Sequence, residues 1–297
     1  MRCSIYAVKI LESQHDDWTE NVRLTSISNG YGGKNVRLKS PLRYPGGKTR
    51  AVKFLAERLP SISQYREPFI GGGSMAIYVT QKYLGVPVWV NDLHYPLYCF
   101  WITLRDNAER MQKDLYDIKS NMNDDKDKSK EIFNQSKSLL DTEEDPYLVG
   151  LHFYIINKCG FSGLSQSSSF SYQASTNNFT KKSIDKLVEY GTMISGWWIT
   201  NLDYSELLDG DDAFVFLDPP YEIGKTYLYG KGGDTHRGFD HDKFAEKCNS
   251  SSNKMMITYN SDSKIKNRFD EWNTEEWDLT YTMRSTGDYR KKQKDRK

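Results

Sequence analysis

The sequence predicts an α/β fold built on a doubly wound parallel sheet. Short apolar runs typical of strands alternate with segments whose apolar residues have helical spacing. A strand is expected at 64–69, followed by the glycine turn 71–73, a helix and a second strand at 86–90. This order of strand, turn, helix and strand is the building block of parallel sheets. Two later apolar runs, 213–217 and 254–259, predict further strands.

The remaining elements follow from the same patterns. Apolar residues at helical spacing predict a helix at 49–59. Further helices are expected at 74–83, in the highly charged stretch 101–145 and in the apolar segment 147–156. The Ser-rich stretch 160–180 is predicted to have no regular structure. Alternating apolar residues at 197–202 again indicate a strand.

Pattern and composition divide the chain into four parts. Residues 1–40 are polar and rich in Gly, Asn and Ser towards their end, and we interpret them as a leader or appended segment with little core of its own. Residues 41–100 carry the first strand, turn, helix and strand, and 205–297 carry the later strands. The mainly helical stretch 101–204 is interpreted as an insert between these two halves.

The composition limits the class of protein. With 297 residues, the chain is long enough for one large α/β domain or a core with an inserted subdomain. Because the formal net charge is +1, overall charge gives no argument for a nucleic-acid partner. The four cysteines form no CxxC pair and no Cys/His cluster, so no metal is implied. No apolar run reaches membrane-spanning length and the start does not resemble a signal peptide, which predicts a cytoplasmic protein.

The tetrapeptide Asp218, Pro219, Pro220 and Tyr221 directly follows the apolar run 213–217. Ligands of doubly wound sheets bind beyond the carboxyl ends of the strands, so this is where an active site is expected. The Asp218 carboxylate and the Pro219 carbonyl can accept the two hydrogens of a planar amino group and aim its nitrogen at a methyl donor. Tyr221 offers a face for a base to stack on. Taken alone, the tetrapeptide also fits a rigid turn.

A second candidate site element is the stretch that begins with Glu67 and Phe69 and ends in the glycine turn 71–73. Glycines after a strand let the main chain approach a ligand closely. The next predicted strand ends at Asp92, about 20 residues after Gly71, where an acidic side chain can hold the ribose of an adenosine cofactor. The pair does not distinguish S-adenosylmethionine from a dinucleotide.

A third element is the turn around Gly47, which places Tyr44 and Lys48 before a predicted helix. A phosphate-binding loop needs a glycine six residues before the lysine, and Leu42 occupies that position. Hydrolysis of a nucleoside triphosphate is therefore a poor fit. The turn either caps the helix or presents Tyr44 and Lys48 to a ligand.

These three elements, in this order, resemble the Dam-like N6-adenine DNA methyltransferases of the D12 class, also called the alpha group. That family carries an aromatic-x-Gly-Gly-Lys turn, then (Glu/Asp)-Pro-Phe-x-Gly-x-Gly, Asn-Asp after the next strand, and Asp-Pro-Pro-Tyr late in the chain. The stretch 157–164 also looks like the family's Asn-Arg-x-x-(Phe/Tyr)-x-Gly-Leu motif, and 161–207 is most similar to bacteriophage members. The resemblance covers about residues 41–290.

The resemblance implies a Rossmann-like sheet of the S-adenosylmethionine-dependent methyltransferases, with an inserted, mainly helical target recognition subdomain. Residues 41–100 would then be the cofactor-binding half, 101–204 the target recognition insert and 205–297 the catalytic half. The expected cofactor is S-adenosyl-L-methionine. The residues implied to contact it or line its pocket are Tyr44, Lys48, Phe69, Gly71, Gly73, Asp92 and Asp218.

The resemblance also implies double-stranded DNA as the substrate, with adenine N6 in a short specific sequence as the methyl acceptor. Asn157 and Lys158 are expected near the duplex, although Lys158 stands where the family usually has Arg. The loop 222–242, which contains Lys225 and Arg237, is predicted to close over the target strand. No membrane and no obligate protein partner are implied.

Two alternatives remain at this stage. One is another amino methyltransferase on the same scaffold, acting on cytosine N4, on RNA or on a glutamine side chain. Cytosine N4 enzymes more often carry Ser, and glutamine enzymes Asn, in place of Asp218. The other alternative is a DNA-binding relative of the same fold that does not catalyse transfer.

Overall fold

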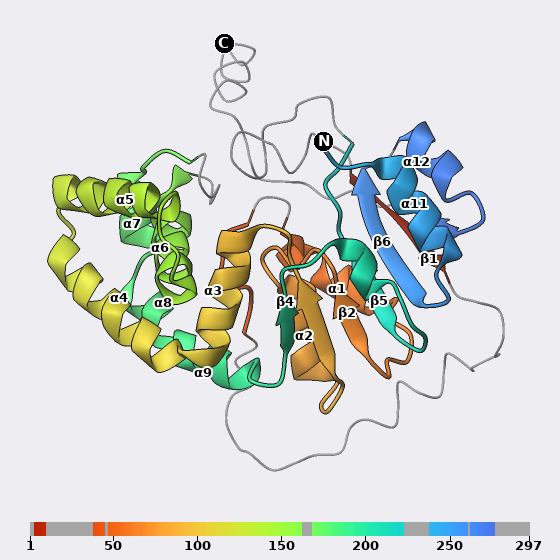
Figure 1. Cartoon of the computed structure of the whole chain (residues 1–297), viewed down its shortest axis with the longest axis horizontal. Coiled ribbons are helices and arrows are strands. Elements are labelled where there is room, and N and C mark those ends of the chain that lie inside the picture. The colour runs from red at the N-terminus through yellow and green to blue at the C-terminus, as the bar shows by residue number, and fades with distance from the viewer. Residues whose placement is uncertain are drawn as a thin grey trace, which may run out of the picture.

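The computed structural model describes residues 3–9, 38–44, 47–161, 168–222, 238–260 and 262–276. It confirms the predicted α/β class, because helices flank a central sheet whose inner strands are parallel (Figure 1). Within the described residues the sheet has seven strands in the order β4-β3-β2-β5-β6-β1-β7. The strands are β1 (Cys3–Lys9), β2 (Tyr65–Glu67), β3 (Val88–Asn91), β4 (Trp198–Thr200), β5 (Phe214–Leu217), β6 (Lys254–Asn260) and β7 (Asn273–Glu275).

The first half of the sheet is assembled by parallel pairing around β2. Tyr65 of β2 pairs with Val88 of β3 on one side and with Phe214 of β5 on the other. Strand β4 extends the sheet beyond β3, and β6 extends it beyond β5, both in parallel. The chain order therefore reverses direction between β2 and β5, which places the crevice for a ligand at their carboxyl ends. Because β4 pairs in the sheet, the helical insert ends before it, inside the range 101–204.

Strand β1 differs from the expectation for the leader, because residues 3–9 form part of the sheet. β1 pairs antiparallel with β6, Cys3 lying opposite Asn260, and antiparallel with β7 on its other edge. This strand was not predicted, since a long polar stretch separates it from the rest of the sheet domain. Its pairing partners lie near the opposite end of the chain, and no local pattern reveals such pairing.

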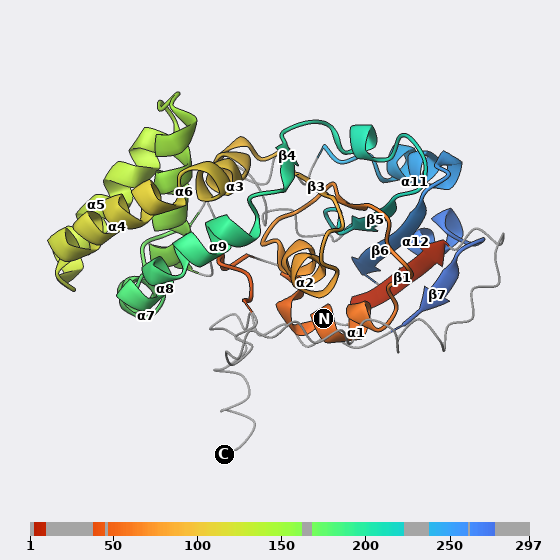
Figure 2. The same cartoon turned by 90° about the horizontal axis from the view of Figure 1, so that it is seen from below.

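The helices fall into two groups, one against the sheet and one in the insert. Helices α1 and α2 lie on one side of the sheet and α11 on the other (Figure 2). Those of the sheet domain are η1 (Lys48–Arg50, 3-10), α1 (Val52–Ala56), α2 (Ser74–Lys82), η3 (Tyr204–Leu207, 3-10), α11 (His241–Ser250) and α12 (Ser263–Arg268). Those of the insert and its stem are α3 (Tyr95–Asp106), α4 (Ala108–Met122), α5 (Lys126–Leu140), α6 (Pro146–Cys159), α7 (Tyr172–Asn177), α8 (Lys181–Asp185) and α9 (Leu187–Met193). No helix among the described residues is long and apolar enough to cross a bilayer.

Apart from β1, the predicted strands and helices are confirmed with shifted ends, and one further expectation was wrong. The stretch 160–180 was expected to be irregular, but it contains α7. The side chain of Ser171 caps this helix by accepting a hydrogen bond from the main-chain N–H of Ala174. Ala174 and Ser175 are buried, so packing stabilises a short helix that a Ser-rich composition does not predict.

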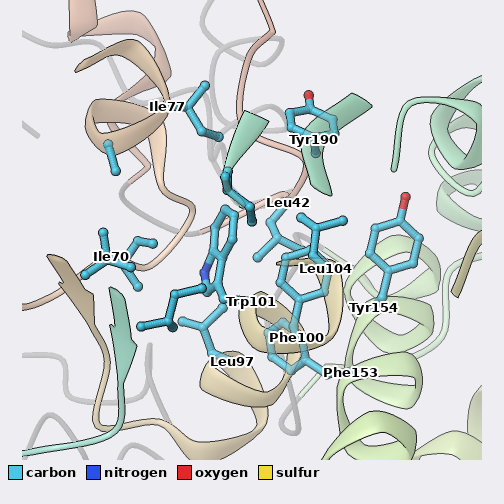
Figure 3. Close-up of a cluster of buried hydrophobic side chains, with 14 of the residues drawn as sticks. Leu42, Ile70, Ile77, Leu97, Phe100, Trp101, Leu104, Phe153, Tyr154 and Tyr190 are labelled. Atoms are coloured by element: carbon cyan, nitrogen blue, oxygen red, sulfur yellow. The ribbon is translucent and has the colours of Figure 1, made fainter. Parts of the chain in front are cut away.

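A continuous core joins the insert to the sheet domain through α3. Trp101 and Phe100 of α3 lie between Ile70, which follows β2, and Tyr154 of α6 (Figure 3). The rings of Phe100 and Tyr154 stack with centroids 5.7 Å apart. Because this packing is apolar and fully buried, the insert is held firmly against the sheet.

Candidate functional site

A cavity of about 370 Å³ opens at the carboxyl ends of the central strands. Its walls come from the segments that follow these strands: residues 67–75 at the end of β2, 91–94 at the end of β3 and 218–220 after β5. Tyr44 and Lys48 complete the wall from the turn before η1. Three separate sequence elements thus meet at one edge of the sheet.

The glycine turn after β2 is shaped by positive main-chain φ angles. Gly71 has φ +47° and Gly73 has φ +67°, a region that glycine adopts without cost. A Cβ on Gly73 would lie 2.7 Å from the Trp101 ring, and one on Gly71 would lie 2.9 Å from the Tyr44 ring. Glycine is therefore required both by conformation and by the closeness of two aromatic rings. The Gly71 N–H points to the Asp92 carboxylate that follows β3, while the Gly73 N–H bonds back to the Ile70 carbonyl and closes the turn.

In the described part of the chain, the hydrogen bonds to the Asp92 carboxylate come from main-chain N–H groups. Its Oδ2 accepts a hydrogen bond from the N–H of Gly71 at 3.0 Å, and its Oδ1 accepts one from the N–H of His94 at 3.0 Å. Desolvation raises the pKa of Asp92 to about 6, while these hydrogen bonds act in the opposite direction. The side chain is an acceptor fixed at the end of β3, where the sequence predicted a ribose-binding carboxylate.

Asp218 is held by side chains from distant segments. The Lys48 ammonium lies 2.6 Å from its Oδ1 and 2.5 Å from its Oδ2, and the Thr258 hydroxyl donates to Oδ1 at 2.6 Å. Lys48 is buried, so this charge pair is shielded from solvent. Asp218, Pro219 and Pro220 line the cavity, whereas Tyr221 lies beside it with its ring 6.0 Å from that of Tyr259.

Glu67, at the end of β2, is a further acidic residue that lines the cavity. Its side chain is buried and accepts a hydrogen bond from the Tyr65 hydroxyl at 2.8 Å. Burial and, less strongly, the nearby charge of Asp218 raise the pKa of Glu67, while its hydrogen bonds and Lys48 lower it; together they bring the pKa to about 8. The environment of Glu67 therefore favours its protonated form.

Aromatic side chains form one wall of the cavity. Phe69 stacks on Tyr204 with ring centroids 5.5 Å apart, and Phe239 lies against both rings at 5.8 and 5.6 Å. Asp203 lines the cavity beside Tyr204. Such a wall suits a flat heterocycle, because aromatic faces stack and the adjacent carboxylate can accept a hydrogen bond from an amino group.

The cavity brings together most of the residues named from the sequence. Those that line it are Tyr44, Lys48, Phe69, Gly71, Gly73, Asp92, Asp218, Pro219 and Pro220. Asn157 and Lys158 lie elsewhere, buried at the end of α6, and their predicted contact with DNA stays a prediction. Lys225 and Arg237, with most of the loop expected to close over the target strand, fall outside the described residues.

Three residues of the site had no role predicted from the sequence: Thr258, Asp203 and Tyr204. Glu67 was placed only in the stretch that leads to the glycine turn. A signal existed for Asp203, since it follows the predicted strand 197–202 much as Asp92 follows β3. Thr258 is a polar residue in an otherwise apolar run. Its contact with Asp218 can be expected only once β6 is known to lie beside β5 in the sheet.

The fold and the site together define a class. A glycine turn with a following carboxylate suits a nucleoside-type cofactor, and an Asp-Pro-Pro strand tip that faces the same cavity suits transfer of a group to an amino nitrogen. The family model for D12 class N6 adenine-specific DNA methyltransferases matches residues 44–283, and the chain belongs to this family. It therefore acts on adenine in DNA and uses a methyl donor.

Two relatives with assigned names agree with this family. The chain is 25% identical over 260 residues to the type II methyltransferase M.MjaIII of Methanocaldococcus jannaschii, covering 76% of this chain and 86% of the relative. It is 23% identical over 256 residues to the type II methyltransferase M.CviBI of Paramecium bursaria Chlorella virus NC1A, covering 83% and 92%. Both matches extend across the sheet domain and the insert.

Proposed function

We propose that this methyltransferase uses S-adenosylmethionine and methylates N6 of an adenine within a short specific sequence of double-stranded DNA. The adenine is turned out of the duplex into the cavity, since an amino group inside a stacked helix cannot reach Asp218. The observation that carries the proposal is that Asp218 and Pro219 line the same cavity as Gly71 and Asp92. The methyl acceptor and the cofactor can therefore meet there.

The residues present fit S-adenosylmethionine. The Asp92 carboxylate can accept hydrogen bonds from ribose hydroxyls, and the adenine ring can stack on the wall of Phe69, Tyr204 and Phe239. Asp203 can accept a hydrogen bond from the adenine amino group. When bound, the cofactor supplies a methyl group already activated by its sulfonium. The chain then only has to orient the acceptor and exclude water.

The catalytic role falls to the Asp218 carboxylate and the Pro219 carbonyl, which hold the two hydrogens of the target amino group. Lys48 and Thr258 fix the carboxylate in place, so its orientation does not have to be found during the reaction. Tyr221 offers a face against which the extruded adenine stacks. With S-adenosylmethionine bound, the amino nitrogen would form its bond to the methyl carbon directly and in line as the carbon–sulfur bond breaks. S-adenosylhomocysteine would leave, and the surplus proton of the amino group would pass to solvent.

Contacts with the DNA backbone are proposed for Lys225 and Arg237, whose charges follow the catalytic motif in sequence. The two relatives are named type II methyltransferases, so we also propose that this enzyme serves as the modification component of a restriction-modification system. We propose that it acts in the cytoplasm of a bacterial or phage-infected cell.

The test is transfer of a tritiated methyl group from S-adenosylmethionine to unmodified plasmid DNA, followed by nucleoside analysis and mapping of the methylated positions. The expected product is N6-methyladenine at one recurring short sequence. N4-methylcytosine, or label only in RNA or protein, would contradict the proposed substrate. Cofactor binding without any transfer would contradict the proposed activity.

A further inference from the structure

Residues 38–44 connect the sheet domain to the helical insert through hydrogen bonds to both, and we call them the bridge segment. On one side they bond to the sheet domain. The Gln81 side chain of α2 exchanges two hydrogen bonds with the main chain of Leu38, each 3.0 Å long. The Ser40 hydroxyl donates to the carbonyl of Gly72 at 2.5 Å. The bridge segment is therefore attached directly to the glycine turn of the cavity.

On the other side the bridge segment is held by the end of α6 in the insert. The Asn157 amide donates to the Arg43 carbonyl at 2.7 Å and accepts from the Arg43 N–H at 3.0 Å. The Lys158 ammonium donates to the Pro41 carbonyl at 2.5 Å. Arg43 returns the contact, since its guanidinium donates to the Gly160 carbonyl at 3.0 Å.

The burial of Asn157 and Lys158 argues against a contact with DNA. Asn157 is 0% exposed and Lys158 is 8% exposed. The Lys158 ammonium lies 5.1 Å from the centroid of the Tyr154 ring, and burial lowers the pKa of Lys158 to about 8. A lysine that binds phosphate keeps its ammonium at the surface, where DNA can approach it.

The bridge segment leads straight into the cavity wall. Tyr44, its last residue, places its ring against the turn at Gly71 and accepts a hydrogen bond from the Gly47 N–H at 3.0 Å. The next residue after Gly47 is Lys48, which pairs with Asp218. A displacement of residues 41–43 would therefore move both the Tyr44 ring, which lines the cavity, and the Lys48 ammonium, which fixes the carboxylate of Asp218.

We propose that Asn157 and Lys158 are positioning residues, which act through the main chain of Pro41 and Arg43 on Tyr44 and Lys48 and do not contact DNA. This inference rests on the proposed cofactor site. At the end of α6, the position of the insert is then coupled to cofactor binding. The coupling arises because the bridge segment is bonded both to α6 of the insert and to the glycine turn of the cavity.

The test is Lys158→Met, which keeps an unbranched side chain one atom shorter than that of lysine and removes the ammonium with its hydrogen bond. We expect the Kd for S-adenosylmethionine, measured by calorimetry without DNA, to rise about tenfold, as loss of a hydrogen bond to a charged group would allow. The dependence of DNA affinity on salt should keep its slope. A phosphate contact predicts the opposite: a slope smaller by about one, with cofactor affinity unchanged.

Controls separate this inference from general destabilisation and from failure of the proposed function. Lys119→Met also removes a largely buried lysine of the insert, but its ammonium pairs with Asp124 at 2.6 Å within the insert, so cofactor affinity should be unchanged. Arg43→Met removes only the bond to Gly160 and should raise the cofactor Kd in the same direction by less. A role in stability alone would lower Tm and leave both Kd values as they are below the transition.

The outcomes are distinct. If the unaltered enzyme does not bind S-adenosylmethionine, the proposed cofactor is wrong. If it binds, and Lys158→Met and Arg43→Met bind equally well, the coupling through the bridge segment is wrong. If Lys158→Met does not fold, Arg43→Met decides the question, because that side chain is only partly buried.

Discussion

Asp92 and Asp218 lie at the same edge of the sheet but are held in different ways. The Asp92 carboxylate accepts from the main-chain N–H groups of Gly71 and His94, both close to it in the first strand, helix and strand unit. The Asp218 carboxylate is fixed by Lys48, 170 positions away in sequence, and by Thr258. The cofactor side of the cavity is therefore built locally, whereas the catalytic side depends on contacts between distant segments.

This difference indicates which perturbations each side tolerates. A site held by main-chain donors keeps its geometry as long as its own turn is intact. A site held by side chains from three segments is sensitive to any change that moves one of them. Changes in the bridge segment are therefore expected to affect catalysis as well as binding, since Lys48 follows that segment directly.

The largest effect is expected for Asp218→Ala. Loss of the acceptor for the target amino group should lower kcat by about a thousandfold, the scale found when one preorganised group is removed from a catalytic site. The affinity for S-adenosylmethionine should change much less. Single-turnover transfer of a tritiated methyl group measures the first quantity and calorimetry the second.

Asp218→Asn is the matched control, because it keeps the shape of the side chain beside Lys48. It should also be strongly impaired, since an amide cannot replace both acceptor oxygens. Turnover within about tenfold of the unaltered enzyme in either variant would show that Asp218 does not hold the target amino group.

Asp92→Asn is expected to act on binding. It should raise the Kd for S-adenosylmethionine by about ten- to a hundredfold, the value of a hydrogen bond to a charged group, and leave kcat at saturating cofactor within a few fold. The pKa of Asp92 is raised to about 6, so affinity of the unaltered enzyme should weaken as pH falls through 6 and the carboxylate is protonated. The variant should lack this pH dependence. A titration series at pH 5.5, 6.5 and 7.5 measures both effects, and equal pH dependence in the two proteins would rule out Asp92 as the acceptor.

The part of the site that could be predicted from the sequence is the part that is built locally, around Asp92. The relation between Gly71 and Asp92 could be predicted because their spacing is fixed by one strand, turn, helix and strand unit. Lys48 and Asp218 could each be placed in a motif, but their pairing could not, since nothing local relates positions so far apart. Thr258 was missed because its role depends only on which strand lies beside β5.

The strand order of the outer sheet was equally beyond local patterns. The alternation of strands and helices predicts a parallel sheet, and β2, β3, β5 and β6 follow it. The antiparallel placement of β1 depends on pairing between opposite ends of the chain. The burial of Asn157 and Lys158 was also not predictable. A polar pair of residues between an apolar helix and a Ser-rich loop is normally expected to be exposed to solvent.

Gly73→Ala tests the local side of the comparison. The variant must place a Cβ 2.7 Å from the Trp101 ring at φ +67°, so we expect a loss of roughly 2 kcal/mol in the free energy of unfolding. Chemical denaturation measures this loss. Gly196→Ala is the matched control, because a Cβ there has nothing within 4 Å, and its stability should be unchanged. Equal stability of the two variants would show that the turn is not constrained by α3.

The smallest effect concerns Glu67, a buried acidic residue that lines the cavity. The folded state holds its proton more tightly than the unfolded state, since burial raises the pKa from 4.5 to about 8. Stability contributed by the protonated group is therefore lost as pH rises towards 8. The Tm of the unaltered enzyme should fall by a few degrees between pH 6.5 and 8.5 relative to that of Glu67→Gln, which carries no titratable group. Parallel Tm curves for the two proteins would contradict the burial of an acidic proton at this position.

The position of β1 has a consequence for synthesis of the chain. β1 separates β6 from β7, although these two strands are consecutive in the sequence. β1 ends at Lys9, whereas its partner strands begin at Lys254 and Asn273, so β1 can pair only after the long stretch between them has been synthesised. Such non-local pairing slows folding. Until then both edges of β1 lack their partner strands, and an unpaired strand edge can associate with other chains, so β1 depends on protection from such association during synthesis.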